Sequence, residues 1–266
     1  MKVPSAVLAG QGATGVTVLQ ALALLPPLGV ALVQRGPAAV ILFVVALAIA
    51  LAGETLFCRL RHRPQTVNGV TTAMIFATLA PPDLAVWQIG LVIGLGVVVG
   101  ELIFGGRGFG FLNAAAVALA LLVFSFPGTA LPAPDVWIAL ATIPGAALLL
   151  ATGVISWRVG LPAFLVVVAL GGAASDSAAL TILAVALAYP AVFLLSDPAA
   201  AATTNHGRLA HGALAGLLIH VFDGVQGAAI APEAVVFAAL LASIFAPLLD
   251  HLAILWNAWR RRLRVV

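Results

Sequence analysis

The few charges of this chain alternate between two kinds of gap that separate apolar segments. Lys and Arg gather in every second gap, whereas Asp and Glu occupy the gaps between them. Of the 266 residues only 8% are charged and 63% are hydrophobic, whereas a soluble domain carries about 25% charged residues. This deficit is too large for a soluble core. It predicts an all-α polytopic membrane protein that crosses the bilayer repeatedly.

Ten apolar segments are long enough to be considered as crossings of one integral membrane domain, 1–266. A full crossing needs about 20 residues, and several of the ten are shorter or broken. Short helices persist in a bilayer where they border protein or a cavity, so we expect the short ones, 69–82, 112–126, 161–173 and 209–222, to surround the functional interior. The ten segments are 14–33, 37–57, 69–82, 84–104, 112–126, 136–155, 161–173, 177–195, 209–222 and 233–256.

The charge pattern also predicts an orientation. With the N-terminus inside, Arg35 is the one basic residue that faces outward, and both termini lie in the cytoplasm, as the positive-inside rule requires. We therefore expect a bacterial cytoplasmic (inner) membrane protein, anchored at its inner face by Trp256 and Trp259. The inner residues are Lys2, Arg59, Arg61, Arg63, Arg107, Arg158, Arg208, Arg260, Arg261, Arg262 and Arg264, and the outer acids are Asp83, Asp135, Asp176, Asp223 and Glu233.

The composition excludes several classes of partner and cofactor. The net charge is +3, but the Arg residues flank apolar segments instead of forming a stripe, so no nucleic acid is expected. Cys58 is the single cysteine, which excludes a disulfide framework and argues against a Cys-ligated cluster. His211 and His220 are nine residues apart, which is a poor spacing for ligands, and no metal site is expected.

The chain contains a faint internal echo. Residues 100–124 and 192–222 share one layout, in which a span leads to an inner loop with one Arg and then to an Ala/Leu helix. Two halves, 14–126 and 136–256, would suit a transporter-like pseudo-repeat. Ala-rich low complexity could produce the same echo.

Three polar segments are candidates for a binding site. Inner loops rich in Gly allow close backbone approach and expose N–H groups to an anion. Each segment also has a structural interpretation: the Gly loop as a tight turn, the Thr hydroxyls bonded to the preceding helical turn, and the Ser-Asp-Pro run as a helix N-cap. The candidates are Asn68 and Thr72 in 64–82, Gly105, Gly106, Arg107 and Asn113 in 105–113, and Asp197, Thr203, Thr204 and Arg208 in 196–208.

Three acids, Glu54, Glu101 and Asp250, lie inside apparent spans. Intramembrane acids are costly, so a functional or paired role is the default expectation, and we treat these three as candidates for an ion path. Glu54 and Glu101 could instead snorkel to the inner interface or pair with Arg59 and Arg107.

The loops resemble those of a known family. ELIFGGRGFGFLNAAA at 101–116, LLSDPAAAATTNHGRLAHGALAGLL at 194–218 and RPQTVNGVTTAMIFATLAPP at 63–82 are similar to segments of the NqrB/RnfD family. That family comprises the NqrB membrane protein of the sodium-pumping NADH:quinone oxidoreductase and the RnfD membrane protein of the Rnf electron-transport complex. Gly110 and Ala114 depart from its Gly-loop motif, whereas Asn113 is kept.

The resemblance implies a flavin, FMN or riboflavin, bound without a covalent link by the residues named above. Family members usually attach FMN to a Thr in an S-G-A-T motif after the fifth span, but the corresponding loop here, 127–135, is short and lacks that motif. Gln11, Gly12, Ala13 and Thr14 match it in part, but at the inner N-terminus, so covalent FMN is not expected. Arg107 or Arg208 would face the phosphate or the reduced ring.

Three functions remain open at this point. The first is a membrane subunit of an Rnf/Nqr-like complex that passes electrons through flavin, with Na⁺ or H⁺ movement coupled to it. Its partners would be flavin- or iron–sulfur-bearing subunits and a quinone, and the chain would have no catalytic residues of its own. The second is a channel or transporter for a small solute. The third is a cofactor-free scaffold for redox partners.

Overall fold

The computed structural model describes residues 13–62, 67–106, 108–171, 176–223 and 230–262. The regular structure in these ranges is helical, with no strand, which confirms the expected all-α class. The helices are α2 (Ala13–Leu60), α3 (Gly69–Leu79), α4 (Val86–Val97) continued by η1 (Val98–Leu102), α5 (Ala114–Ser125), α6 (Val136–Ala151), α7 (Trp157–Leu170), α8 (Ser177–Pro190) continued by η3 (Ala191–Leu195), α9 (Asn205–Asp223) and α10 (Pro232–Arg262).

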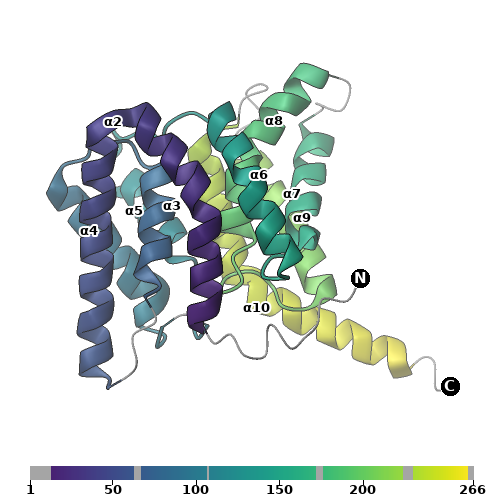
Figure 1. Cartoon of the computed structure of the whole chain (residues 1–266). Coiled ribbons are helices and arrows are strands. Elements are labelled where there is room, and N and C mark those ends of the chain that lie inside the picture. The colour runs from purple at the N-terminus through teal and green to yellow at the C-terminus, as the bar shows by residue number, and fades with distance from the viewer. Residues whose placement is uncertain (1–12, 63–66, 107, 172–175, 224–229, 263–266) are drawn as a thin grey trace.

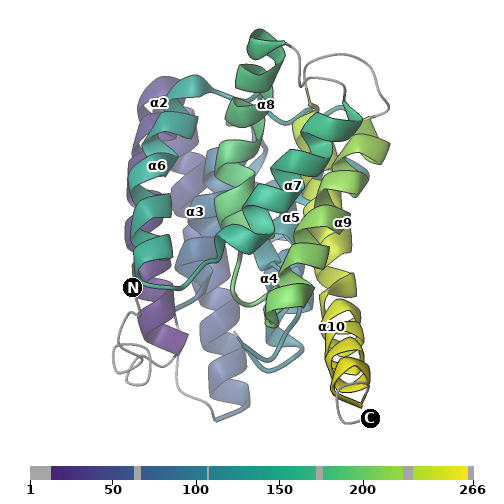
Figure 2. The ribbon, with the colours of Figure 1, turned by 90° about the vertical axis from the view of Figure 1, so that its right-hand side faces the viewer.

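The helices form a bundle in which the chain reverses direction at each connection (Figures 1 and 2). The first reversal lies inside α2, at Gly36, whose φ of 70° and ψ of −158° are not helical. Glycine adopts this backbone conformation without strain, and Pro37 follows it directly. α2 is therefore a hairpin of two arms, which coincide with the expected segments 14–33 and 37–57.

Only part of the bundle has the length of a full crossing. Three helical stretches, 14–60, 177–195 and 232–260, are long and apolar enough to span a bilayer by length and composition. α3, with 11 residues, is about 16 Å long, roughly half of the hydrocarbon thickness. α5 and α7 are also short, as expected, with 12 and 14 residues. The expectation for 209–222 was wrong, because α9 begins at Asn205 and has 19 residues.

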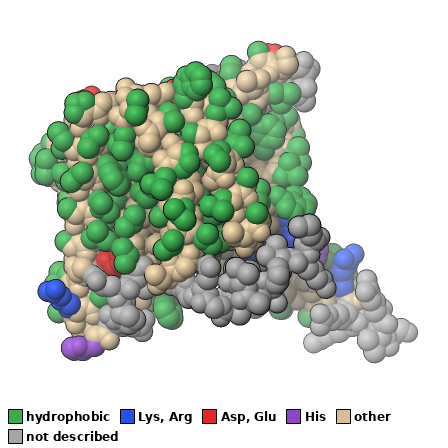
Figure 3. Space-filling model, viewed as in Figure 1, with side chains coloured by type: hydrophobic (Ala, Val, Ile, Leu, Met, Phe, Trp, Pro, Cys, Tyr) green, Lys and Arg blue, Asp and Glu red, His purple; other side chains and the backbone are tan. Residues whose placement is uncertain are grey.

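Most of the described basic side chains gather at one end of the bundle, whereas acidic side chains occur at both ends. Figure 3 shows Arg and His side chains along the lower edge, and acidic side chains along the upper edge and at one place near the lower edge. Two of the upper acids are N-caps: Asp135 accepts from Trp137 N at 2.7 Å at the start of α6, and Asp176 accepts from Ala178 N at 2.9 Å at the start of α8.

Arg35, the basic residue expected at the upper end, has a structural role there. It lies beside the Gly36 reversal, and its Nη1 donates to the carbonyl oxygen of Ala80 at 3.1 Å, just after the end of α3. The carbonyl groups at a helix C-terminus lack intrahelical donors and carry partial negative charge, so a guanidinium is stabilised there.

Small residues bring two pairs of helices into close contact. Gly96 and Gly100 lie four residues apart and face Ala118 and Ala114 of α5. Gly212 of α9 faces the backbone of α7 in the same way: a methyl group on Gly212 would lie 2.2 Å from the carbonyl oxygen of Val159. Such spacing lets helices pack at short distance without lipid between them.

α4 and α8 both end in a π-helical turn, η1 and η3. Each turn leads into one of the lower-end loops that the sequence singled out, 103–113 and 196–204. The shared ending fits the layout of the internal echo, although the two-half repeat stays a prediction. π-turns often mark functional sites; η1 lines the cavity described next, and η3 leads into the loop that lines it.

Candidate functional site

Asn68, at the N-terminus of α3, is the centre of a buried polar network. Its side-chain Oδ1 accepts a hydrogen bond from the Thr17 hydroxyl, and its Nδ2 donates to Glu101 Oε1 at 2.7 Å. The backbone N–H groups of Asn68 and Gly69 donate to the two carboxylate oxygens of Glu54, at 3.2 and 3.1 Å. A buried carboxylate is stabilised by these donors and by the positive end of the α3 dipole.

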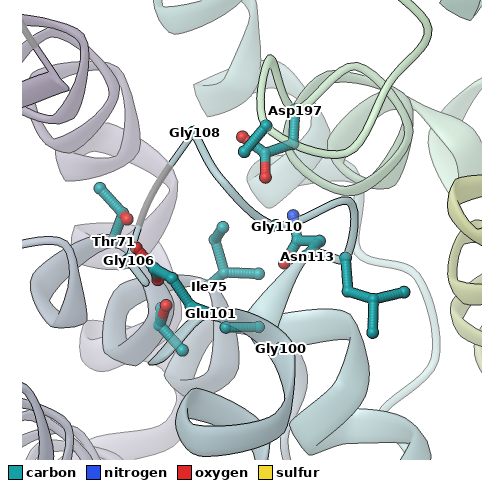
Figure 4. Close-up of a pocket in the computed structure, with 13 residues that line it drawn as sticks. Thr71, Ile75, Gly100, Glu101, Gly106, Gly108, Gly110, Asn113 and Asp197 are labelled. Carbon is teal, nitrogen blue, oxygen red and sulfur yellow. The ribbon is translucent and has the colours of Figure 1, made fainter. Parts of the chain in front are cut away.

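A small cavity lies beside this network at the lower end of the bundle (Figure 4). Polar side chains from α3, η1 and the loop after η3 meet around it, with the Gly loop between them. The volume open to the centres of water molecules is about 20 Å³, which is room for one or two waters. It is lined by Thr71, Thr72, Ile75, Gly100, Glu101, Gly106, Gly108, Gly110, Leu112, Asn113, Ala114, Asp197 and Ala199.

The fold thus brings together candidates from all three polar segments. Thr72, Gly106, Asn113 and Asp197 line one cavity, and Glu101, expected on an ion path, lines it too. Gly105 adjoins the cavity, and its N–H donates to Leu102 O at 3.1 Å. Asn68 is joined to the cavity through its bond to Glu101. Arg107 lies outside the described residues.

The polar groups of the cavity wall also hold the helices in place. Asn113 is the N-cap of α5, with Oδ1 accepting from Ala115 N and Ala116 N at 2.9 and 3.2 Å, while its Nδ2 donates to Phe193 O at 3.1 Å. Asp197 accepts from Gln20 Nε2 at 3.1 Å. These bonds link the first arm of α2, α5 and η3 around the cavity.

The residues present do not fit a flavin in this arrangement. Binding sites for ligands of that size have volumes of about 300–1,000 Å³, whereas this cavity offers about 20 Å³. Asn113, the amide expected to face the ring, already caps α5 and holds Phe193. No electron-transfer step is therefore assigned to a flavin in this cavity.

The remaining candidates form a second cluster away from the cavity. Asp250 of α10 accepts four hydrogen bonds: from Thr203 N and Oγ1 at 2.7 and 2.9 Å, and from Thr204 N and Oγ1 at 2.9 and 2.6 Å. Arg208 Nε donates to Ala202 O at 3.1 Å. The cluster fixes the turn that leads into α9 against α10, much as Glu54 fixes the start of α3.

The structure agrees with the purely structural interpretation for two Thr hydroxyls and disagrees with it for the Ser-Asp-Pro run. Thr71 and Thr78 donate to carbonyl oxygens of their own helix, Asn68 O and Met74 O, at 2.9 and 2.8 Å. The Ser-Asp-Pro run does not cap a long helix, because α9 begins only at Asn205; it forms a turn in which Asp197 O accepts from the N–H groups of Ala200 and Ala201.

Sequence reasoning missed three buried polar side chains. Thr17 and Gln20 lie in the first apolar segment and reach the network and the cavity wall. Tyr189, in α8, lies near the upper end beside Arg35, in a cavity of about 40 Å³, and its hydroxyl has no hydrogen-bond partner in the part of the chain that the structure describes. The sequence did contain a signal for two of them. Gln20 and Tyr189, the chain's single Tyr, lie inside apolar segments, where a polar side chain suggests a buried role.

Comparison with known proteins bears on these loops directly. The model of the NQR2, RnfD, RnfE family matches residues 5–138 and 132–255. The chain belongs to this family. The match includes the α3 start, the Gly loop and the loop after η3, and it confirms the resemblance found in the sequence. Membership of this family, together with apolar helices long enough to cross a bilayer, assigns the chain to a membrane.

Curated relatives are named as the B-type subunit of Na⁺-translocating NADH-quinone reductase. The relative from Pseudomonas aeruginosa is 29% identical, over 79% of this chain and 66% of its own length. The relative from Chromohalobacter salexigens is 27% identical, over 84% of this chain and 67% of its own length. The relative from Ectopseudomonas mendocina is 28% identical, over 86% of this chain and 70% of its own length. The chain thus spans about two thirds of the length of these relatives.

Proposed function

We propose that this chain is a membrane subunit of an Nqr- or Rnf-like complex, in which electron transfer through the complex is coupled to movement of Na⁺ or H⁺. The observation that carries the proposal is the family match over nearly the whole chain. The convergence of its three polar segments on one cavity supports it. The remaining partners would be membrane subunits and flavin- or iron–sulfur-bearing subunits, with a quinone as electron acceptor.

Within that function we assign the cavity to the ion path. Its volume suits water or a small cation, and its walls carry oxygen atoms from Glu101, Asp197 and Thr71. Carboxylate and hydroxyl oxygens are the groups that bind hard cations or relay protons. Glu101 is the central residue, because it both lines the cavity and accepts from Asn68.

The position of the cavity fits this role. It lies at the Arg-rich end of the bundle, where Arg61 Nη1 donates to the carbonyl oxygen of Leu102, next to Glu101, at 2.8 Å, and the positive-inside rule places this end toward the cytoplasm of a bacterial inner membrane. A flavin, which the family resemblance implies, would need a wider space than this cavity provides, so we propose that the redox carriers lie outside it.

The test uses inside-out membrane vesicles that contain the complex with this chain, supplied with NADH and quinone. We expect Glu101→Gln to lower Na⁺ or H⁺ uptake at least fivefold while quinone reduction continues, because Gln keeps an acceptor for Asn68 but removes the charge. Asp83→Asn is the matched control, since Asp83 is an exposed acid at the opposite end, and it should change neither rate.

Two results would contradict the proposal. Ion uptake in Glu101→Gln equal to that in Asp83→Asn would remove the cavity from the ion path. Solute flux through the purified chain alone in proteoliposomes, with no redox partner, would favour the channel function instead.

A further inference from the structure

The last part of α10 leaves the bundle at its Arg-rich end. In Figure 1 this helix, coloured yellow, projects past the neighbouring helices at the lower right. Between it and the first turns of α9 lies an open groove of about 700 Å³. The groove is lined by His206, Ala210, Leu249, Leu252, Ala253, Leu255, Trp256 and Trp259.

The groove wall is apolar and aromatic. Leu252, Trp256 and Trp259 keep about half of their surface exposed, and the two indole rings lie against each other with centroids 5.4 Å apart. Trp side chains are enriched where a membrane helix meets the headgroup region, because the ring is apolar and its N–H is polar. This wall therefore suits hydrocarbon at the level of the inner headgroups.

The rim of the groove is basic. The Arg260 guanidinium lies 5.7 Å from the centre of the Trp256 ring, and Arg158 donates to Asn205 Oδ1 at 3.0 Å, next to His206. Arg261, Arg262 and Arg264 follow in the sequence, and their side chains lie outside those that the structure describes. The groove lining includes no acid among the residues that the structure describes, and the nearby Asp250 is held by four hydrogen bonds from Thr203 and Thr204.

We propose that this groove binds an anionic phospholipid of the inner leaflet. An apolar wall ending in cations matches the two parts of such a lipid: an acyl chain lies along Leu252 and Trp256, and the phosphate is held near Arg260 and His206. Basic pockets between helices on the cytoplasmic side of membrane proteins bind anionic headgroups in this way.

The full chain, purified in detergent and stripped of lipid, is titrated with phosphatidylglycerol and with phosphatidylcholine, and bound lipid is counted by native mass spectrometry. We expect at least tenfold tighter binding of phosphatidylglycerol. Arg260→Gln should weaken it about fivefold, as for the loss of one basic residue near an anionic surface, and Trp256→Ala should weaken both lipids. Added salt should reduce the difference between the lipids.

The controls are matched in residue type. Arg59→Gln removes an exposed Arg at the same end of the bundle, and Trp137→Ala removes an exposed Trp at the other end; neither should change lipid binding. Equal weakening by Arg59→Gln and Arg260→Gln would overturn the proposal. So would crosslinking of position 252 to another subunit in the intact complex, because a protein would then occupy the groove.

Discussion

At the scale of single residues, three side chains that sequence analysis marked as functional also hold helix starts or the turn before one. Glu54 caps α3, Asn113 caps α5, and Asp250 holds the turn before α9. A buried helix end needs such partners, since its first N–H groups have no acceptor within the helix. Of the three, Asn113 also lines the cavity, so this one side chain serves both the cavity and the fold.

This double use predicts the behaviour of Asn113 variants. Asn113→Leu removes the cap of α5 and leaves Phe193 O without its donor, so we expect it to lower stability by about 1–3 kcal/mol. Asn113→Ser keeps a capping oxygen and should lie between Leu and the native chain. Thermal unfolding in detergent, followed by Trp fluorescence, measures this order. An unchanged melting temperature for Asn113→Leu would show that the cap contributes little.

The polar residues themselves could be found from the sequence, but their partners could not. Glu54 was expected on an ion path, with snorkelling or pairing to an Arg as the alternative; the backbone donors of Asn68 and Gly69, across a connection between two helices, were not foreseen. Thr203 and Thr204 were grouped with the residues expected to bind a flavin, yet they donate to Asp250, some 46 residues farther along the chain. Hydrophobic patterning determines which segments are buried and carries no information on which helix lies against which.

At the scale of elements, helix pairing depends on small residues. Gly96 is close enough to α5 that a methyl group on it would lie 2.6 Å from Ala118 Cβ, whereas Gly94, on the same helix, has nothing within 4 Å. The expected segments located the helices well because each is an apolar run ended by Gly, Pro or a charge. The composition did not indicate which helices contact each other, because Gly and Ala occur throughout the chain.

Gly96→Ala and Gly94→Ala form a matched pair of variants. We expect Gly96→Ala to lower stability by about 1–3 kcal/mol, because α4 and α5 must separate. Gly94→Ala should be neutral or stabilise by up to about 1 kcal/mol through helix propensity. Melting temperatures of the two purified variants measure the difference. Equal values would mean that α4 and α5 tolerate a wider spacing.

At the scale of the whole molecule, the basic side chains give the bundle two distinct ends. The alternation in the sequence predicted that Arg would gather at one end, and Figure 3 shows the visible basic side chains along the lower edge, while acidic ones lie along the upper edge and at one place near the lower edge. Two of the acids, Asp135 and Asp176, lie at the upper end as N-caps of α6 and α8. Capping of helix N-termini therefore places acids at the end of the bundle where the orientation argument expected them.

The orientation can be measured with single cysteines in a Cys58→Ser background, since Cys58 is the only native thiol. Cysteines at Phe109 and at Gly128 occupy opposite ends of α5. In intact cells, a membrane-impermeant maleimide should label position 128 and leave position 109 unlabelled until the membrane is opened. Labelling of position 109 in intact cells would reverse the proposed orientation.

The contact between Glu54 and the start of α3 has a consequence for the connection between α2 and α3. Two hydrogen bonds to Asn68 N and Gly69 N hold the helix start against the second arm of α2. We therefore expect lengthening of this connection to cost mainly loop-closure entropy, about 0.6 kcal/mol for each doubling. In such a variant a carboxylate, as well as the covalent chain, would keep α3 beside α2.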